Sequence, residues 1–150
     1  MTMTDLKTFA DLVALDHGLC VVATLRADGS PQATVVNAGV LPHPLGDSDV
    51  VGFVARGGTA KLAHLRRNST VAVTVRGGWQ WTTVEGSAQL IGPDDPHPDI
   101  DGERLRLLLR EIFTAAGGTH DDWDTYDRVM REERRTAVLV SPTRIYSNPA

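Results

Sequence analysis

The most informative stretch of this sequence is residues 50–76, VVGFVARGGTAKLAHLRRNSTVAVTVR, in which two apolar runs flank a polar segment. Residues 50–55 and 70–75 are rich in valine, which favours β-strands. The two glycines at 57–58 break the first run, and a helix with leucines three residues apart is predicted from Thr59 onward. This stretch therefore predicts a strand, a tight turn, a short helix and a second strand.

Further strands are predicted on both sides of this stretch, at residues 19–25, 31–40, 79–91 and 136–146. Asp28-Gly29 is a pair typical of hairpin turns and joins the first two of them. Gly86 is a candidate β-bulge in the third. Because the strands come in hairpins with helices inserted, and not in regular β–α alternation, an antiparallel α+β barrel is favoured over a Rossmann sheet.

Three more helices are predicted from apolar residues at helical spacing. The first has Thr4 as its N-cap and Gly18 as its stop. Asp101 caps the second, and residues 121–135 form the third. Neither a repeat nor a linker interrupts the pattern, which predicts a single domain over residues 1–150.

The 150-residue chain has a formal net charge of −4 and is 41% hydrophobic, like an ordinary globular protein. An acidic chain argues against nucleic acid as a partner, and no apolar run is long enough to cross a membrane. The N-terminal segment lacks the features of a signal peptide, which predicts a cytoplasmic location. The single Cys20 excludes an internal disulfide, and its apolar neighbours predict a buried thiol.

Positive charge gathers in residues 50–84, which contain basic side chains but no Asp or Glu. Arg56 and Lys61 enclose Gly58, Thr59 and Ala60 at the predicted helix start. A helix N-terminus already carries positive potential, so two further cations are unfavourable there unless an anion joins them. Because Arg and Lys both bind phosphate well, the segment predicts a phosphate site.

An alternative is that these cations pair with acids elsewhere in the chain, either Asp94 and Asp95 or the acids at 121–124. Arg66 and Arg67 lie further along the helix, where they suit its C-terminal dipole. For these two arginines we favour a structural role.

Several other residues allow more than one interpretation. Trp79 and Trp81 are two apart on a predicted strand and so face one side, where they line a ring pocket, contact a second subunit or pack in the core. Asn37 interrupts an apolar strand and needs a partner, which is either a cofactor or the backbone. The scattered histidines form no HExxH or HxH pair and GxSxG is absent, so neither a metal site nor a hydrolase triad is predicted.

Four segments form a familiar succession: ATLRADGSPQATVVNAG, VVGFVARGGTAKLAHLRRN, TVAVTVRGGWQWTTVEGSAQLIGP and RRTAVLVSPTRIYSNP. Together they resemble the pyridoxamine-phosphate-oxidase-like split-barrel flavoproteins. Within that group they are most similar to the actinobacterial flavin/deazaflavin oxidoreductases that use coenzyme F-420. The resemblance implies an α+β fold, a six-stranded antiparallel split β-barrel with peripheral helices of the FMN-binding type. It also implies a homodimer with two cofactor sites at the interface.

The resemblance also implies roles for individual residues. In the family, a basic residue at the end of the third strand and a Lys at the start of the next helix bind the cofactor phosphate. Here these are Arg56 and Lys61, with Gly58 and Thr59 as further donors. The residues implied to lie along the flavin ring or to reach it from the partner chain are Thr34, Val35, Val36, Asn37, Trp79 and Trp81.

The implied function is a reductase that passes a hydride from reduced F-420 to an electrophilic, conjugated small molecule such as an enone or quinone. Such an enzyme needs no catalytic motif of its own, because the cofactor carries the chemistry. One alternative is an FMN-dependent oxidoreductase of the same fold. Another is a non-catalytic protein that stores a flavin or haem, for which His17 and His64 are the candidate haem ligands.

Overall fold

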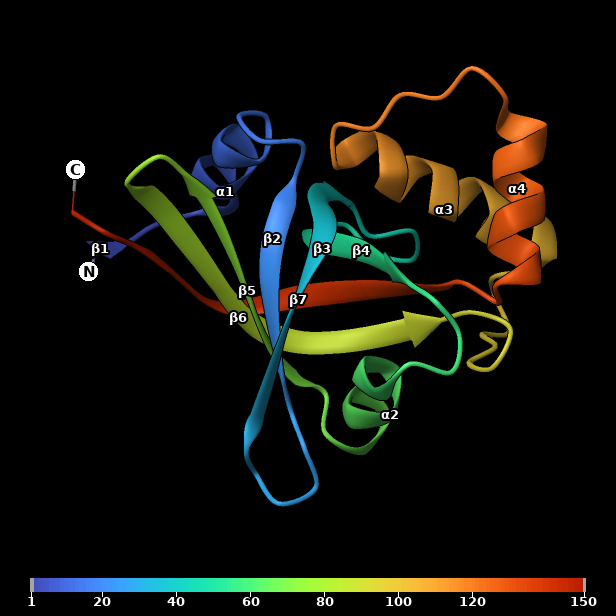
Figure 1. Ribbon diagram of the computed structural model, residues 1–150, viewed down its shortest axis with the longest axis horizontal. Helices are drawn as coiled ribbons and strands as arrows, with labels where there is room; N and C mark the ends of the chain where they lie inside the picture. The colour runs from blue at the N-terminus through green and yellow to red at the C-terminus, as the bar shows by residue number, and fades with distance from the viewer. Residues whose placement is uncertain (1, 150) are drawn as a thin grey trace.

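The computed structural model describes residues 2–149, and within them it contains an antiparallel sheet and four helices (Figure 1). The strands are β1 (Thr2–Met3), β2 (Leu19–Leu25), β3 (Pro31–Pro42), β4 (Asp49–Ala55), β5 (Thr70–Gly77), β6 (Gln80–Ile91) and β7 (Thr136–Ser147). The helices are α1 (Leu6–Val13), α2 (Ala60–Arg67), α3 (Gly102–Ala115) and α4 (Trp123–Glu132).

The sheet closes on itself. Its strand order is β1-β7-β4-β3-β2-β5-β6, and β7 pairs with β6 as well as with β4. Strands β2 to β7 therefore form a six-stranded antiparallel barrel, and the short β1 extends the edge of β7. The predicted fold class is confirmed.

The barrel core follows from the alternation of side chains along each strand. In β5, Val71, Val73 and Val75 are buried, while the residues between them are more exposed. The register of β6 against β7 shifts between Glu85 and Gly86, at the position predicted for a bulge. The extra residue is Thr143 of β7 and not a residue of β6, because Glu85 pairs with Arg144 and Gly86 with Pro142. A Cβ at Gly86 would lie 2.1 Å from the Ser141 carbonyl oxygen, so only glycine lets β7 approach this closely.

The helices form where they were predicted, with changes at their ends. The N-cap of α1 is Asp5, whose carboxylate accepts from the Thr8 amide at 3.2 Å, and not Thr4. This helix also ends at Val13 and not near Gly18. Asp101 caps α3 as predicted, accepting from the Arg104 amide at 2.7 Å. None of the helices in residues 2–149 has the length and apolar character needed to cross a membrane.

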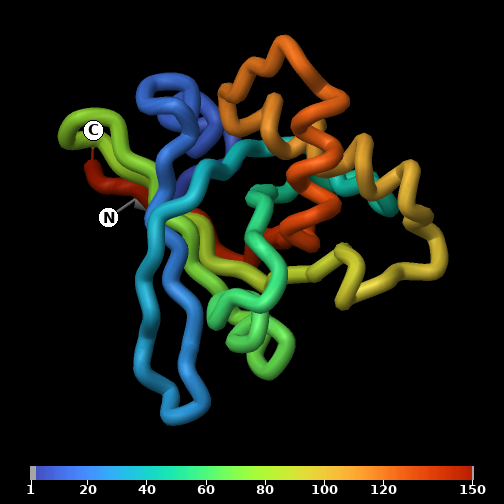
Figure 2. Tube along the Cα trace, turned by 45° about the vertical axis from the view of Figure 1, so that its right-hand side comes forward, coloured from blue at the N-terminus to red at the C-terminus, as the bar shows by residue number. Residues whose placement is uncertain are grey.

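Two features of the arrangement position the functional site. The pair α3–α4 packs against one side of the barrel over β3, β4 and β7, through a second apolar cluster that includes Leu108 and Ile112. The tip of the β2–β3 hairpin projects beyond the barrel in both views (Figures 1 and 2). Pairing of β3 with β4 starts only at Ala38, so residues 31–37 of β3 pair with β2 alone. This unpaired edge is the split in the barrel.

Candidate functional site

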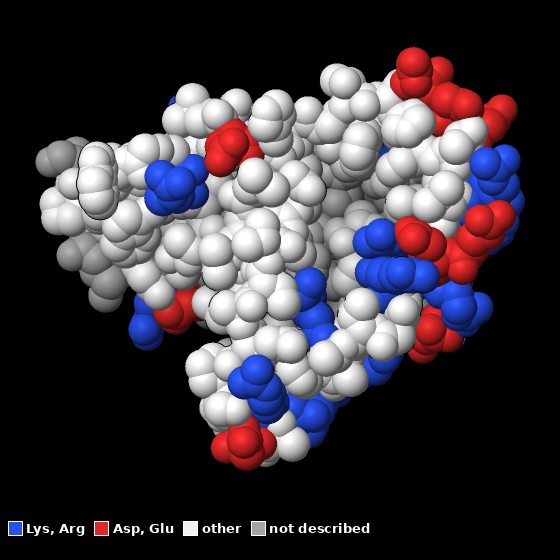
Figure 3. All heavy atoms as spheres, viewed as in Figure 1, with Lys and Arg blue, Asp and Glu red and all other residues white. Residues whose placement is uncertain are grey.

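A cavity of about 510 Å³ opens where the split in β3 meets the end of β4, the start of α2 and the α3–α4 pair. Figure 3 shows a hollow between the barrel and these helices, with Lys and Arg side chains at its rim. The lining residues are His17, Val35, Val36, Asn37, Val54, Ala55, Arg56, Thr59, Lys61, Ile112, Phe113, Ala116, Gly117, Gly118, Tyr126, Met130 and Arg135.

The turn from β4 into α2 supplies the polar end of the cavity. It packs closely against the α4–β7 turn, since a Cβ at Gly57 would lie 2.7 Å from the Arg134 carbonyl oxygen. The helix was predicted from Thr59 onward, and Thr59 is its N-cap, in an extended conformation; its side chain does not cap the helix. The Thr59 hydroxyl is buried and has no hydrogen-bond partner in the part of the chain that the structure describes. A buried donor beside a helix N-terminus fits an anionic ligand oxygen.

Lys61 lies in the first turn of α2 and lines the same end of the cavity. It forms no ion pair with any acid of residues 2–149, and its ammonium lies 5.9 Å from the centre of the Phe53 ring. Burial, and then the positive charge of Arg135, lower the pKa of Lys61 below its ordinary value. A positive charge that is desolvated and uncompensated by the protein is a ready partner for an external anion.

Arg135 is a third cation of the cavity, and it is absent from the residues predicted as the site. It stands beside Arg56 because Ala55 and Thr136 are register partners in the antiparallel β4–β7 pair. The sequence signal that could have found it is this register, together with the basic Arg134-Arg135 pair just before the last strand. Arg135 bonds to Glu133 at 2.9 and 3.0 Å, and Arg56 lies 3.9 Å from the same carboxylate.

The open edge of β3 forms a second wall. Val35, Val36 and Asn37, which the resemblance places along the ring, line this wall, whereas Thr34 does not, and its hydroxyl is buried without a partner among the described residues. The Asn37 amide donates to the His17 carbonyl at 2.7 Å, so the backbone contact is the one formed in this structure. A strand edge with free peptide groups offers hydrogen bonds to the heteroatoms of a planar ring.

The facing wall is apolar and comes from α3 and α4. Ile112, Phe113 and Met130 line it together with Tyr126, whose hydroxyl donates to the Leu109 carbonyl at 3.0 Å. Burial raises the pKa of Tyr126 to about 12, so this phenol stays neutral. The cavity thus joins an apolar, ring-sized portion to a cationic end.

Other predicted residues lie elsewhere or have other partners. Gly58 belongs to the β4–α2 turn and Ala60 is the first residue of α2, and neither lines the cavity. Trp79 lies in the turn before β6 and is 95% exposed, while Trp81 is half-buried with its ring 6.1 Å from that of Tyr146. The two tryptophans therefore do not share one strand face, because β6 begins only at Gln80. Neither lines the cavity of its own chain.

The alternative that the cations of residues 50–84 pair with acids or carbonyls of the protein itself holds for some of them. Arg66 binds Asp95 at 2.7 Å, and Arg67 donates to the Leu25 carbonyl at 2.8 Å. Asp94 pairs with Arg134. Arg66 and Arg67 thus have structural partners, whereas Arg56 and Lys61 remain at the cavity.

The fold places the chain among the split β-barrel proteins. The family profile described as pyridoxamine 5'-phosphate oxidase matches residues 7–147, and the chain belongs to this family.

Solved structures agree with that fold. A conserved hypothetical protein of Mycobacterium tuberculosis has 18% identity and a TM-score of 0.67, over 97% of this chain and 85% of that one. A pyridoxamine 5'-phosphate oxidase-related, FMN-binding protein of Nostoc punctiforme has 14% identity and a TM-score of 0.64, over 98% and 86%. An F420 reductase has 20% identity and a TM-score of 0.57, over 89% and 93%.

Proposed function

We propose that this protein is an oxidoreductase that uses the deazaflavin cofactor F-420 to reduce an electrophilic, conjugated small molecule. The observation that carries the proposal is the cavity itself. Its one end gathers Arg56, Lys61 and Arg135 around a helix start with an unpartnered Thr59 hydroxyl, and its other end is apolar and bounded by a free strand edge. A ligand made of a flat ring and a phosphate matches both ends.

Each wall has a separate task in this proposal. Arg56 and Lys61 bind the phosphate, and Arg135 adds a third positive charge from a different segment. The β3 edge at residues 35–37 orients the ring. The apolar α3–α4 wall excludes water from the reacting face. When bound in its reduced form, the deazaflavin supplies a hydride to the substrate.

A homodimer is part of the proposal. Leu19, Val21 and Val35 are exposed apolar residues on adjacent strands, and Val21 is the register partner of Val35. Val35 also lines the cavity, so a second copy seated on this face would stand beside the site. We propose that Trp79 and Trp81 reach the site from the partner chain, since they do not reach the cavity of their own.

The visible absorption spectrum of the purified protein, followed by separate titrations with F-420 and FMN, tests the choice of cofactor. We expect F-420 to bind more tightly than FMN, and the F-420-loaded protein to reduce members of a panel of enones and quinones. Tight retention of FMN with no binding of F-420 would overturn the choice. Binding of F-420 without turnover of any substrate would favour a storage protein.

The phosphate contacts have their own test. We expect Arg56→Ala and Lys61→Ala each to weaken F-420 binding by about 1–3 kcal/mol, the value of a charge-assisted contact. Arg67→Ala is the matched control, because Arg67 is on the same helix but donates to Leu25 outside the cavity. Unchanged affinity in both cavity variants would show that the phosphate binds elsewhere.

FMN is the second candidate cofactor. Three cations around one helix start also suit the double negative charge of a phosphate monoester, and an FMN-binding protein shares the fold. The same titrations separate the two cofactors. For a haem-storing protein, His17 is the histidine at the cavity, whereas His64 is bonded to the Thr24 hydroxyl at 2.9 Å and does not line it.

A further inference from the structure

Glu133 is the one acid within 4 Å of a cation of the cavity among the described residues. Its two carboxylate oxygens face two different arginines. Oε1 lies 3.0 Å from Nε and 2.9 Å from Nη2 of Arg135, and Oε2 lies 3.9 Å from Nε of Arg56. Glu133 therefore stands between the two guanidinium groups.

The Glu133 carboxylate contacts the cations of the cavity but does not itself line the cavity. Arg56 and Arg135 line the cavity, whereas Glu133 does not. Its position is built into the backbone, because the Glu133 carbonyl accepts from the Gly57 amide at 3.0 Å and so joins the α4–β7 turn to the β4–α2 turn. Its side chain is 28% exposed, as is that of Arg135. Lys61 has no such counter-ion among residues 2–149, so the Glu133 carboxylate pairs with the two arginines and not with Lys61.

We propose that Glu133 is an internal counter-ion that holds Arg56 and Arg135 in the cofactor-free protein and lowers the affinity of the site for phosphate. The proposal rests on the function proposed above and assigns a residue that regulates that same site. A phosphate bound to the same arginines lies close to the Glu133 carboxylate, and two negative charges at such distances repel each other. The arginines meanwhile exchange a carboxylate partner for a phosphate, to which a guanidinium donates two parallel bonds.

The proposal predicts that neutralising Glu133 strengthens the binding of phosphate-bearing ligands, whereas most substitutions near a binding site weaken it. We expect Glu133→Gln to bind F-420 and FMN roughly tenfold more tightly than the wild type at low salt, with a smaller gain at high salt. Riboflavin and the phosphate-free deazaflavin chromophore should bind both proteins equally, because they present no phosphate to the arginines. Fluorescence titration measures all four ligands.

The matched control is Glu132→Gln. Glu132 is the preceding residue, is 66% exposed and lies 3.9 Å from Arg128, away from the cavity. Glu132→Gln removes the same charge one position along the chain, so we expect this variant to bind all four ligands with the affinity of the wild type. A role in positioning Arg135 predicts the reverse of the proposal, namely weaker binding of phosphate-bearing ligands by Glu133→Gln. Weaker or unchanged binding would overturn the counter-ion role.

A second titration separates this proposal from the proposed function. Pyrophosphate is added to the wild type and to Glu133→Gln, and the Nε–Hε signals of Arg56 and Arg135 are followed by NMR. Tighter binding of pyrophosphate by the variant supports the counter-ion role even if neither flavin binds, in which case only the cofactor assignment fails. Equal or weaker binding of pyrophosphate overturns the counter-ion role whatever the flavins do.

Discussion

At the scale of the residue, Lys61 shows how the site and the stability of the protein oppose each other. Its ammonium is partly buried, has no acidic partner in residues 2–149 and is repelled by Arg135. The lowered pKa means that the folded chain binds this proton less readily than the unfolded chain. The charge therefore destabilises the cofactor-free protein, and a bound anion removes that cost.

We expect Lys61→Met to raise the melting temperature of the cofactor-free protein by roughly 2–4 °C at pH 7, a gain near 1 kcal/mol. Methionine keeps the apolar stem beside Phe53 and removes the charge. The sign of this change follows from the lowered pKa of Lys61. As the pH falls through the folded-state pKa, Lys61 becomes charged and the wild type loses stability, whereas the variant has no such charge. The difference between the proteins should disappear above about pH 10.5, the ordinary lysine pKa.

Calorimetry with and without F-420 measures both consequences, because the variant should also lose most of the stabilisation by the cofactor. Lys7→Met is the control. Lys7 is exposed on α1 and pairs with Asp11, so its loss should change neither quantity appreciably. A variant less stable than the wild type at pH 7 would contradict the account of Lys61.

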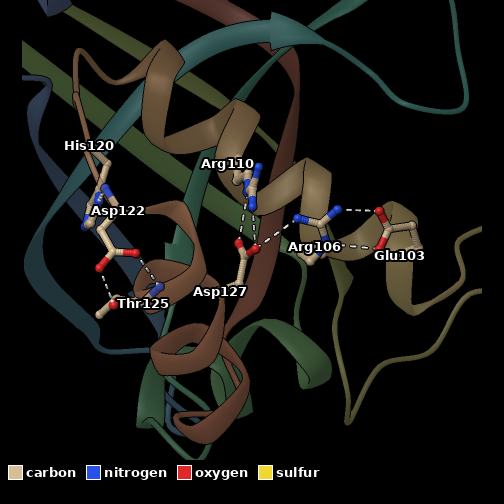
Figure 4. A network of polar contacts seen from close by, with 7 residues as sticks. All are labelled: Glu103, Arg106, Arg110, His120, Asp122, Thr125 and Asp127. Atoms are coloured by element: carbon tan, nitrogen blue, oxygen red, sulfur yellow. Dashed lines mark hydrogen bonds and ion pairs between the residues drawn. The ribbon is translucent and has the colours of Figure 1, made fainter.

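At the scale of the element, one carboxylate joins α3 and α4, the two helices that form the apolar wall of the cavity. Asp127 of α4 is buried and accepts from Arg106 at 2.9 Å and from Arg110 at 2.9 Å through its Nε, and Arg106 also pairs with Glu103 (Figure 4). The Arg110 guanidinium lies 5.1 Å from the centre of the Trp123 ring. These contacts hold α4 against α3 and so place Tyr126 and Met130, neighbours of Asp127 on α4, at the cavity.

We expect Asp127→Asn to lower the free energy of unfolding by about 2 kcal/mol at pH 7, since it removes the ion-pair partner of Arg110 and leaves Arg106 with Glu103 alone. The hydrogen bond from Arg110 holds the pKa of Asp127 below its ordinary value. Its contribution is therefore present above about pH 4 and lost as the pH falls through the folded-state pKa. Urea denaturation at pH 7 and at pH 3 should show a large difference between wild type and variant that shrinks in acid.

Asp121→Asn is the control for this helix pair. Asp121 is exposed and precedes α4, so its loss should cost less than about 0.5 kcal/mol. A cost for Asp127→Asn that stays the same at pH 3 would show that packing and not charge explains it.

At the scale of the whole molecule, the exposed apolar face on β2 and β3 is a candidate surface for contact with a second copy of the chain. Leu19, Val21 and Val35 are 43%, 45% and 65% exposed and stand on neighbouring strands, and Val35 also lines the cavity. Contiguous apolar surface of this kind marks contact sites in soluble proteins. A second copy seated there would bury the face and complete the site with residues of both chains, as proposed above.

We expect Val21→Glu to convert the proposed dimer into a monomer, raising the dimer dissociation constant roughly a hundredfold. A carboxylate in the centre of an apolar contact must be desolvated in both copies, which explains the size of the effect. Sedimentation equilibrium across a range of protein concentrations measures the constant. Leu45→Glu is the control, because Leu45 is 40% exposed but lies in the β3–β4 loop. A wild-type protein that sediments as a monomer would rule out the homodimer.

Local patterns in the sequence predicted the elements and one end of the cavity. The valine-rich alternating runs predicted the strands of the barrel, and Gly86 marked the position of the register shift, although the extra residue lies in β7. Thr59 was correctly placed at the start of α2, and Arg56 and Lys61, predicted to lie at this helix start, both line the cavity. These features depend on residues a few positions apart in the sequence. Side-chain alternation along a strand and the dipole at a helix start are both set by such near neighbours.

Contacts between distant segments required the tertiary structure. Arg135 stands beside Arg56, and Glu133 between them, only because β4 and β7 pair in one register, about 80 residues apart along the chain. The position of Trp79 in a turn and the free edge of β3 were equally hidden from local pattern. The sequence by itself determined which residues form strands and where a basic turn begins a helix. The closure of the barrel decided which charges meet, because strand register is a property of the whole core and not of any one segment.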